Sequence, residues 1–248
     1  MRKTKIIATL GPATFSKEKI RQLIKTGVNA VRINMSHEVD PNVLEDVVNY
    51  TRKESQDMGN PVAILFDLCG PKIRIGKLNG VRSIKIKKGK EYSLGFKNCH
   101  IPLNMPLSFS HKSEGAQIKV DDGNLVFDII KSENNTLTIQ ALDSGSIIKG
   151  KGINFPGIKL NIPPFTKKDS QDLALAVELG ADWLAMSFVQ SANDIDLIKD
   201  ELSEMGVKIP VIAKIEKPEA MKNLGSIIHA FDGILVARGD LGVEMPMQ

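Results

Sequence analysis

Residues 30–36 read Ala-Val-Arg-Ile-Asn-Met-Ser. Apolar side chains alternate here with Arg32, Asn34 and Ser36, and a period of two is typical of a β-strand. Such a strand would place the three polar side chains on one face and the apolar ones on the other. The run therefore predicts a buried strand whose end carries a polar cluster.

Helical and strand patterns alternate on both sides of this run. Ser16 can cap a helix that Gly27 ends. The expected elements, in order, are a strand at 5–10, a helix at 17–25, the strand at 30–36, a helix at 41–58 and a strand at 61–67. Strands that alternate with helices in this way are typical of βα units around a parallel sheet.

The pattern changes between about Ile73 and Gly157. Short alternating segments such as Gln117–Val120 and Thr136–Leu142 follow one another, and turn signals separate them. The βα pattern then returns, with helices expected at 167–180, 194–205 and 220–229 and strands at 181–189, 209–216 and 231–240. We therefore expect an all-β domain at 73–157, inserted between two parts of one α/β domain at 1–72 and 158–248.

Six strands lie outside the insert, whereas a closed (β/α)8 barrel needs eight βα units. The sequence thus predicts a TIM-type barrel truncated to about six units. An open parallel sheet has two bare edges, so we also expect self-association into a homo-oligomer.

Bulk properties narrow the classes of function. Lys and Arg number 33 against 29 Asp and Glu, and a net charge of +4 is too small to favour a nucleic-acid-binding protein. Cys69 and Cys99 form neither a disulfide framework nor a zinc site, which is typical of a reduced, cytoplasmic protein. No segment has the length and apolarity of a signal peptide or a membrane span, so we expect no membrane partner.

Charged residues gather where the predicted strands end. Besides the cluster of the second strand, they are Asp67, Lys214, Glu216 and Asp240. A (β/α)8 barrel carries its active site at this rim. Glu216 and Asp240 are hard oxygen ligands that suit Mg²⁺. Arg32 offers a planar fork for a phosphate, and Lys214 a compact charge for a developing oxyanion. The rim predicts Mg²⁺-assisted chemistry on a phosphorylated small molecule.

Six motifs in order resemble those of the N-terminal half of pyruvate kinases. They cover the whole chain and lie at Thr4–Ala13, Val31–His37, Asp67–Gly76, Lys151–Gly157, Ala213–Glu216 and Asp232–Glu244. Each motif alone is a weak pattern, but six in the same order are specific.

The resemblance implies a (β/α)8 domain with an inserted β-barrel lid, and transfer of the phosphoryl group of phosphoenolpyruvate to ADP, giving ATP. It implies that Arg32 clamps the phosphate and that Lys214 stabilises the phosphoryl and enolate charge. Backbone N–H groups near Gly239 and Asp240 would bind the substrate carboxylate. The complete protein would be a tetramer.

The resemblance also implies nucleotide and metal sites. Asn34, His37, Arg74 and Lys151 would face the nucleotide phosphates, and Glu216 and Asp240 would hold Mg²⁺ or Mn²⁺. A K⁺ ion would be bound by Asn34, Ser36, Asp67 and the backbone carbonyl of Leu68.

Lys72 departs from the family pattern. Potassium-dependent members typically have Glu here, and an ammonium group is a fair replacement for a monovalent cation. We therefore expect activity that needs Mg²⁺ but not K⁺. The alternative is that Lys72 is a solvated loop residue.

Two other functions compete with pyruvate kinase activity. A Mg²⁺-dependent enolate lyase or aldolase would also pair Glu and Asp at strand ends, but it would need no lid lysine such as Lys151 and no nucleotide-facing Arg74. A non-catalytic binding protein could keep the site with an incomplete barrel.

Overall fold

The computed structural model describes residues 3–37, 39–133, 135–158, 160 and 162–245. The chain forms two compact units. The first, here called the barrel unit, comprises residues 1–71, 164–215 and 219–235. The second, called the β-domain unit, comprises residues 72–163, 216–218 and 236–248. The domain boundaries expected from the sequence, at 72 and 157, stay predictions.

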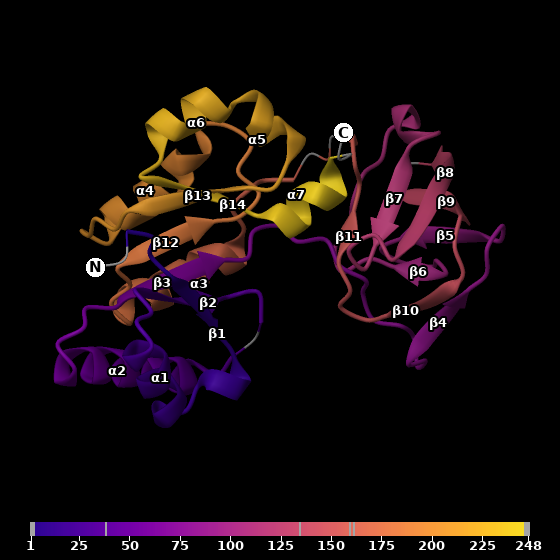
Figure 1. The fold of residues 1–248 in the computed structure, drawn as a ribbon. Coiled ribbons are helices and arrows are strands. Elements are labelled where there is room, and N and C mark those ends of the chain that lie inside the picture. Colours follow the sequence, from indigo (N-terminus) through magenta and orange to yellow (C-terminus); the bar gives the residue numbers. More distant parts are fainter. Residues whose placement is uncertain (1–2, 38, 134, 159, 161, 246–248) are drawn as a thin grey trace. The chain divides into compact units, whose positions relative to one another are not determined.

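A six-stranded sheet forms the centre of the barrel unit (Figure 1). Its strands are β1 (Ile7–Leu10), β2 (Ala30–Asn34), β3 (Ala63–Leu68), β12 (Trp183–Met186), β13 (Val211–Ile215) and β14 (Gly233–Val236). They neighbour one another in this same order, and the pairs from β1 to β13 are parallel. Sequential parallel order is the order of a (β/α)8 barrel, so the predicted fold class is confirmed, with six strands in the described part of the chain.

Helices connect these strands, and the first four lie where the sequence predicts them. They are α1 (Lys17–Lys25), α2 (Pro41–Asp57), α3 (Lys167–Glu178), α4 (Asp194–Glu204), α5 (Pro218–Lys222) and α6 (Leu224–Ala230). Ser16 caps α1 by accepting a hydrogen bond from the Lys19 N–H at 3.4 Å. Thr166 and Asp169 form a reciprocal capping box at the start of α3.

Two expected elements near the C-terminal end were wrong in detail. The helix expected at 220–229 is two short helices, because Asn223 interrupts it and donates its side-chain amide to the carbonyl of Gln190. The strand expected at 231–240 ends at Val236, and α7 (Arg238–Glu244) follows it. Asp240 therefore lies in the first turn of a helix rather than at a strand end.

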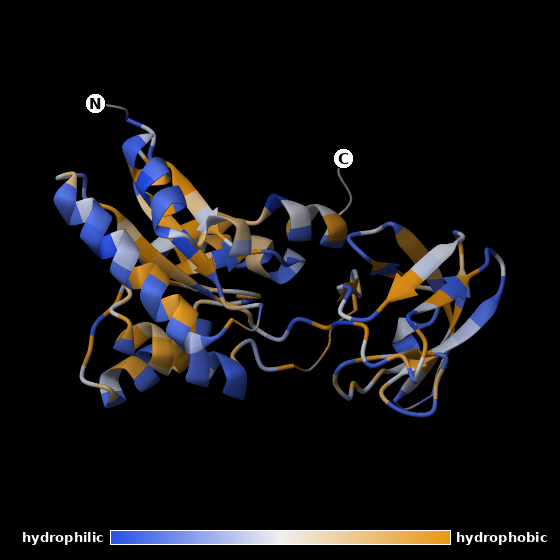
Figure 2. Cartoon of the chain, turned by 90° about the horizontal axis from the view of Figure 1, so that it is seen from below, coloured by the Kyte–Doolittle hydropathy of each residue, from blue (hydrophilic) through white to orange (hydrophobic). Residues whose placement is uncertain are grey.

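Apolar side chains bury the sheet on both faces. On one face Val31, Ile64, Phe66 and Leu184 have 0% exposed surface, and on the other face Leu65 and Ala185 are 2% and 0% exposed, as expected for parallel strands buried on both faces. Figure 2 shows these strands as mostly hydrophobic and the surrounding helices as mixed, with hydrophilic residues interspersed. Polar side chains such as Asp67 are thus exceptions within an apolar core.

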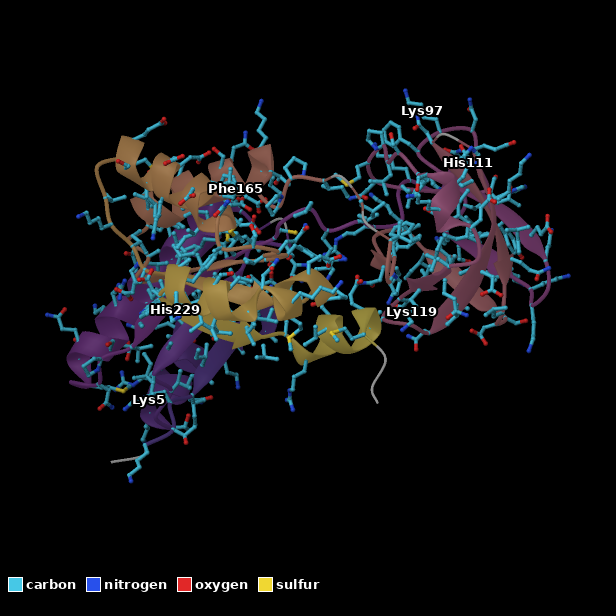
Figure 3. All side chains as sticks on the ribbon, turned by 90° about the horizontal axis from the view of Figure 1, so that it is seen from above. Lys5, Lys97, His111, Lys119, Phe165 and His229 are labelled. Carbon is cyan, nitrogen blue, oxygen red and sulfur yellow. The ribbon has the colours of Figure 1, made fainter. Side chains whose placement is uncertain are left out.

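In the described residues of the inserted segment, all elements are strands apart from one 3-10 turn at His111–Ser113, which confirms the predicted β domain. One mixed sheet has the order β11-β7-β8-β9-β5-β6, and a second pairs β10 with β4. Their bounds are β4 (Ser83–Ile86), β5 (Glu91–Gly95), β6 (Ile101–Pro102), β7 (Gln117–Val120), β8 (Leu125–Glu133), β9 (Thr136–Ala141), β10 (Gly145–Ile148) and β11 (Ile153–Asn154). Phe127, with 0% exposed surface, packs edge-on against Tyr92 in its core. Figure 3 shows Lys97 and His111 at the periphery of this domain.

The barrel sheet ends at β1 on one side and at β14 on the other. Large apolar side chains at these edges remain exposed, including Ile7 at 50% and Val236 at 58%. Among the described residues, no helix is both long enough and apolar enough to cross a membrane.

Candidate functional site

Arg32 and Asp67 form a partly buried ion pair at the carboxyl ends of β2 and β3. The Arg32 Nε donates to Asp67 Oδ2 at 2.7 Å, and Nη2 contacts the same oxygen. Nη1 donates to Thr9 Oγ1 at 2.9 Å, so three nitrogens of the guanidinium are engaged. Asp67 is 1% exposed. The pair fixes the guanidinium plane, which is the group suited to bind a phosphate.

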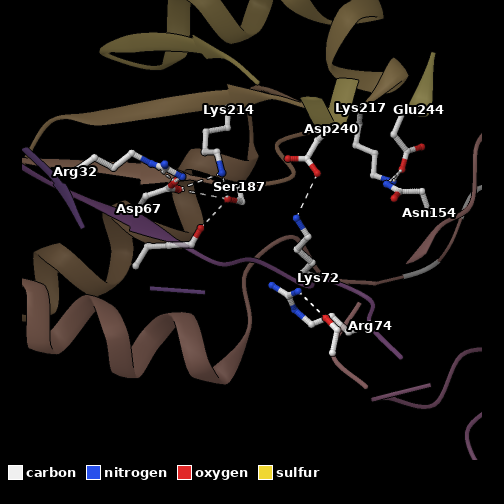
Figure 4. Close-up of polar contacts among 12 residues, drawn as sticks. Arg32, Asp67, Lys72, Arg74, Asn154, Ser187, Lys214, Lys217, Asp240 and Glu244 are labelled. Atoms are coloured by element: carbon white, nitrogen blue, oxygen red, sulfur yellow. Dashed lines mark hydrogen bonds and ion pairs between the residues drawn. The ribbon is translucent and has the colours of Figure 1, made fainter. Parts of the chain in front are cut away.

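Lys214 approaches the same carboxylate from β13. Its ammonium lies 3.2 Å from Asp67 Oδ1 and donates to Ser187 Oγ at 2.7 Å. Ser187 in turn donates to the carbonyl of Leu68 at 2.7 Å. Figure 4 shows both cations directed toward Asp67. Burial of Lys214, 9% exposed, is therefore compensated by a carboxylate and a hydroxyl.

Backbone strain lies beside this cluster. Phe188 follows Ser187 and has a φ of 58°, which is rare for a bulky residue. A Cβ added to Gly70 would lie 2.8 Å from the Phe188 ring, and Gly70 itself has a φ of 64°. The Gly70 N–H donates to Asp169 Oδ1 at 2.9 Å, which ties this loop to the start of α3. The loop after β3 thus supports the residues that orient Lys214.

The other polar residues after β2 lie in a turn. Asn34 Oδ1 accepts from the Ser36 N–H at 3.0 Å, so Ser36 lies beyond the strand that the alternation predicts. His37 is exposed. The oxygens of Asn34, Asp67 and Leu68, which the family resemblance assigns to K⁺, all accept hydrogen bonds or ion pairs from protein donors here.

Arg74 and Lys151 both belong to the β-domain unit. Arg74 pairs with Gly152 across an antiparallel bridge, and its guanidinium donates to the carbonyl of Gly150 at 2.9 Å. Lys151 lies 2.7 Å from Asp121 Oδ1. The hydrogen bond from Lys151, and a smaller one from Asn124, lower the pKa of Asp121 below its ordinary value of 3.8. Two cations predicted to face a nucleotide thus lie on two segments that the Arg74–Gly152 bridge joins.

Lys72 contacts Asp240, a pairing that the sequence did not indicate. Its ammonium lies 3.3 Å from Asp240 Oδ1, and both side chains are 29% exposed. Gly239 and Asp240 lie in the first turn of α7. N–H groups in the first turn of a helix lack acceptors within the helix, so they can bind an anion.

A divalent cation fits the chemistry of Glu216 and Asp240. Both belong to the β-domain unit and supply carboxylate oxygens, the ligands that Mg²⁺ prefers. The Lys72 ammonium already provides a positive charge at Asp240. Among the described residues, no group of three or more His, Cys, Asp or Glu side chains is arranged to hold a metal. Two carboxylates would need oxygens from substrate and water to complete an octahedron.

The sequence predicts that Arg32, Asp67 and Lys214 lie at one rim of the sheet. In the structure, Arg32 and Lys214 both contact Asp67. Sequence reasoning gave no role to Ser187, although this serine lies within the predicted strand at 181–189. The available signal was its position at the carboxyl end of that strand.

Comparisons with known proteins identify the family of this chain. The family model described as pyruvate kinase, barrel domain, matches residues 1–248. The chain belongs to the pyruvate kinase family. It is 40% identical to pyruvate kinase 2 of Synechocystis sp. over all of this chain and 43% of that protein. It is 36% identical to pyruvate kinase of Corynebacterium efficiens over all of this chain and 53% of that protein.

A third relative, pyruvate kinase of Thermococcus litoralis, is 37% identical over 99% of this chain and 52% of its own length. The chain therefore spans about half the length of these curated pyruvate kinases. The family membership confirms the resemblance inferred from the six motifs.

Proposed function

We propose that this chain carries the phosphoenolpyruvate, nucleotide and Mg²⁺ sites of a pyruvate kinase, which transfers a phosphoryl group from phosphoenolpyruvate to ADP. The convergence of Arg32 and Lys214 on buried Asp67 carries this proposal. A buried carboxylate that holds two cations at a strand-end rim aligns them for an anionic substrate.

Arg32 binds the substrate phosphate in this proposal. The Arg32 side chain is 24% exposed, and Asp67 and Thr9 hold its guanidinium in place. Lys214 lies on the same carboxylate and stabilises charge on the phosphoryl group and the enolate as they separate. Ser187 orients the Lys214 ammonium through its 2.7 Å hydrogen bond. Catalysis then rests on positioning and charge neutralisation, as in phosphoryl transfer generally.

Residues of the β-domain unit bind the rest of the reactants. Arg74 and Lys151 bind nucleotide phosphates, and the family resemblance assigns the same role to Asn34 and His37 of the barrel unit. The N–H groups at Gly239 and Asp240 receive the substrate carboxylate. Glu216 and Asp240 hold Mg²⁺ or Mn²⁺, which would neutralise charge on substrate oxygens when bound.

We also propose that K⁺ is dispensable. Lys72 carries a positive charge at the start of the β-domain unit, and the oxygens of Asn34 and Leu68, two of the residues expected to bind K⁺, already accept protein donors. Two free cysteines, Cys69 and Cys99, support a reducing, cytoplasmic location.

The test is pyruvate formation from phosphoenolpyruvate and ADP with Mg²⁺, together with calorimetric binding of phosphoenolpyruvate. Lys214→Met should lower turnover by about 10²-fold or more, as loss of a transition-state charge does elsewhere. Lys97→Met, which removes an exposed lysine of the β domain, should change neither quantity. A folded chain that neither forms pyruvate nor binds phosphoenolpyruvate in the presence of Mg²⁺ would contradict the proposal.

A further inference from the structure

Glu244 is a buried carboxylate in the last turn of α7. It is 5% exposed, and its Oε1 accepts from Lys217 Nζ at 2.7 Å and from Asn154 Nδ2 at 2.8 Å (Figure 4). Both distances are those of good hydrogen bonds, and the one to Lys217 is charge-assisted. Glu244 therefore holds two donors on a single oxygen.

These donors come from two different segments of the β-domain unit. Lys217 directly follows Glu216, and Asn154 lies in β11. Glu244 itself lies one helical turn after Asp240, on the same short helix. The two carboxylates proposed to hold the divalent cation are thus carried by segments that meet at Glu244.

A second contact fixes the same end of α7 to the β domain. Lys119 on β7 donates its ammonium to the carbonyl of Val243 at 2.7 Å. Figure 3 labels Lys119 beside the yellow α7 helix. The last turn of α7 is therefore attached to β7 through its backbone and to β11 through the Glu244 side chain.

We infer that Glu244 is a positioning residue of the metal site. Through Lys217 and Asn154 it holds the segments bearing Glu216 and Asp240 at the spacing a divalent cation needs, and it attaches them to the β domain. This inference rests on the proposed function, because it takes Glu216 and Asp240 as metal ligands. Partners that orient metal ligands typically affect metal affinity by about 10- to 100-fold.

The test measures Mn²⁺ affinity directly, from the electron paramagnetic resonance signal of free Mn²⁺ titrated with the 248-residue chain. Glu244→Gln keeps an oxygen that can accept from Asn154 but removes the charge that holds Lys217. Lys217→Met removes the other half of the pair. Each should weaken Mn²⁺ binding about 10-fold. Lys217→Arg keeps the charge and should restore most of the affinity.

Two further variants serve as controls. Glu133→Gln breaks the exposed Lys131–Glu133 ion pair of β8 and should leave Mn²⁺ affinity unchanged. Asp240→Asn should nearly abolish binding, because it removes a proposed ligand. If Glu244→Gln fails to fold because the Glu244 charge opposite Lys217 is lost, the double variant Lys217→Met/Glu244→Gln, which removes both charges of this pair, is used for the test instead.

The possible outcomes distinguish the positioning role of Glu244 from the proposed metal site itself. Weakened Mn²⁺ binding in the folded Glu244 and Lys217 variants, with rescue by Lys217→Arg, supports the inference. Affinity within twofold of the unaltered chain, while Asp240→Asn abolishes binding, overturns the inference and leaves the proposed metal site in place. Equal affinity of the unaltered chain and Asp240→Asn overturns both.

Discussion

The Lys72 ammonium lies 3.3 Å from Asp240 Oδ1, so a cation of the chain occupies a carboxylate proposed to bind a divalent metal. Both side chains are 29% exposed, and water screens part of their attraction. A metal ion must nevertheless compete with this ammonium for the carboxylate.

Lys72→Gln should therefore tighten Mn²⁺ binding. Removal of a screened positive charge near the metal is worth about 1 kcal/mol, or roughly a fivefold lower dissociation constant. A titration of the free Mn²⁺ resonance signal would measure it, with Lys77→Gln, an exposed lysine on the same segment, as the control. Unchanged affinity in Lys72→Gln would show that the ammonium does not compete.

Lys72→Glu should make turnover depend on K⁺. The substitution replaces a fixed positive charge with a negative one, and a monovalent cation can then supply the lost charge. The measurement is the rate of pyruvate formation with and without K⁺, at constant ionic strength, for the unaltered chain and the variant. An equal response to K⁺ in both would contradict the proposed role of Lys72.

The sequence predicts the parts of this site that follow from a local pattern of residues, and it misses those that depend on contacts between distant residues. Period-two alternation placed Arg32 correctly, because strand geometry alone determines which side chains share a face. Asp240 was misplaced at a strand end, since a short helix after β14 leaves no periodic pattern in seven residues. The contact between Lys72 and Asp240 joins residues 168 apart, and no local pattern reports such a pairing.

The strained backbone beside Ser187 was also beyond sequence reasoning. Phe188 has a φ that its residue type rarely adopts, so local propensity argues against the observed conformation. The surrounding structure must impose this conformation, and such strain tends to cluster at functional sites.

Gly70→Ala should destabilise the barrel unit and disturb Lys214. The new Cβ would lie 2.8 Å from the Phe188 ring and 3.2 Å from Ser187 Cβ, in addition to the strain of a positive φ. We expect a loss of about 2–3 kcal/mol in the free energy of unfolding, measured by urea titration.

Gly59→Ala is the matched control for this change. Gly59 has a φ of 62°, but nothing lies within 4 Å of the added Cβ. It should therefore cost only the backbone strain, about 1 kcal/mol. An equal loss in the free energy of unfolding for the two variants would mean that Phe188 and Ser187 move aside without destabilising the fold.

Val236→Lys should reduce self-association of the chain. Val236 is 58% exposed on β14, an edge strand of the barrel sheet, and a lysine on an edge disfavours pairing with another strand. Val81→Lys changes an equally exposed valine, at 57%, in the β domain and serves as control. Sedimentation velocity would measure the oligomer. Identical behaviour of both variants and the unaltered chain would argue against an interface at β14.

Asp121→Asn should strengthen ADP binding. Asp121 holds the Lys151 ammonium at 2.7 Å, and Lys151 must leave it to reach a nucleotide phosphate. Exposed ion pairs are worth about 0–1 kcal/mol, so release should lower the dissociation constant by up to roughly fivefold. Fluorescence titration with a labelled ADP would measure it. Asp128→Asn, which affects only a contact with Gln117, is the control.

The same pair predicts a dependence of stability on pH. Because the pKa of Asp121 is lowered in the folded protein, its contribution to stability is fully present above the ordinary value of 3.8 and is lost as the pH falls through the lower folded value. Asp121→Asn should remove this part of the acid sensitivity, so urea titrations at pH 7 and near pH 3 should differ less for the variant. An unchanged difference would mean that the Lys151–Asp121 pair does not persist in solution, and the expected gain in ADP affinity would then lose its basis.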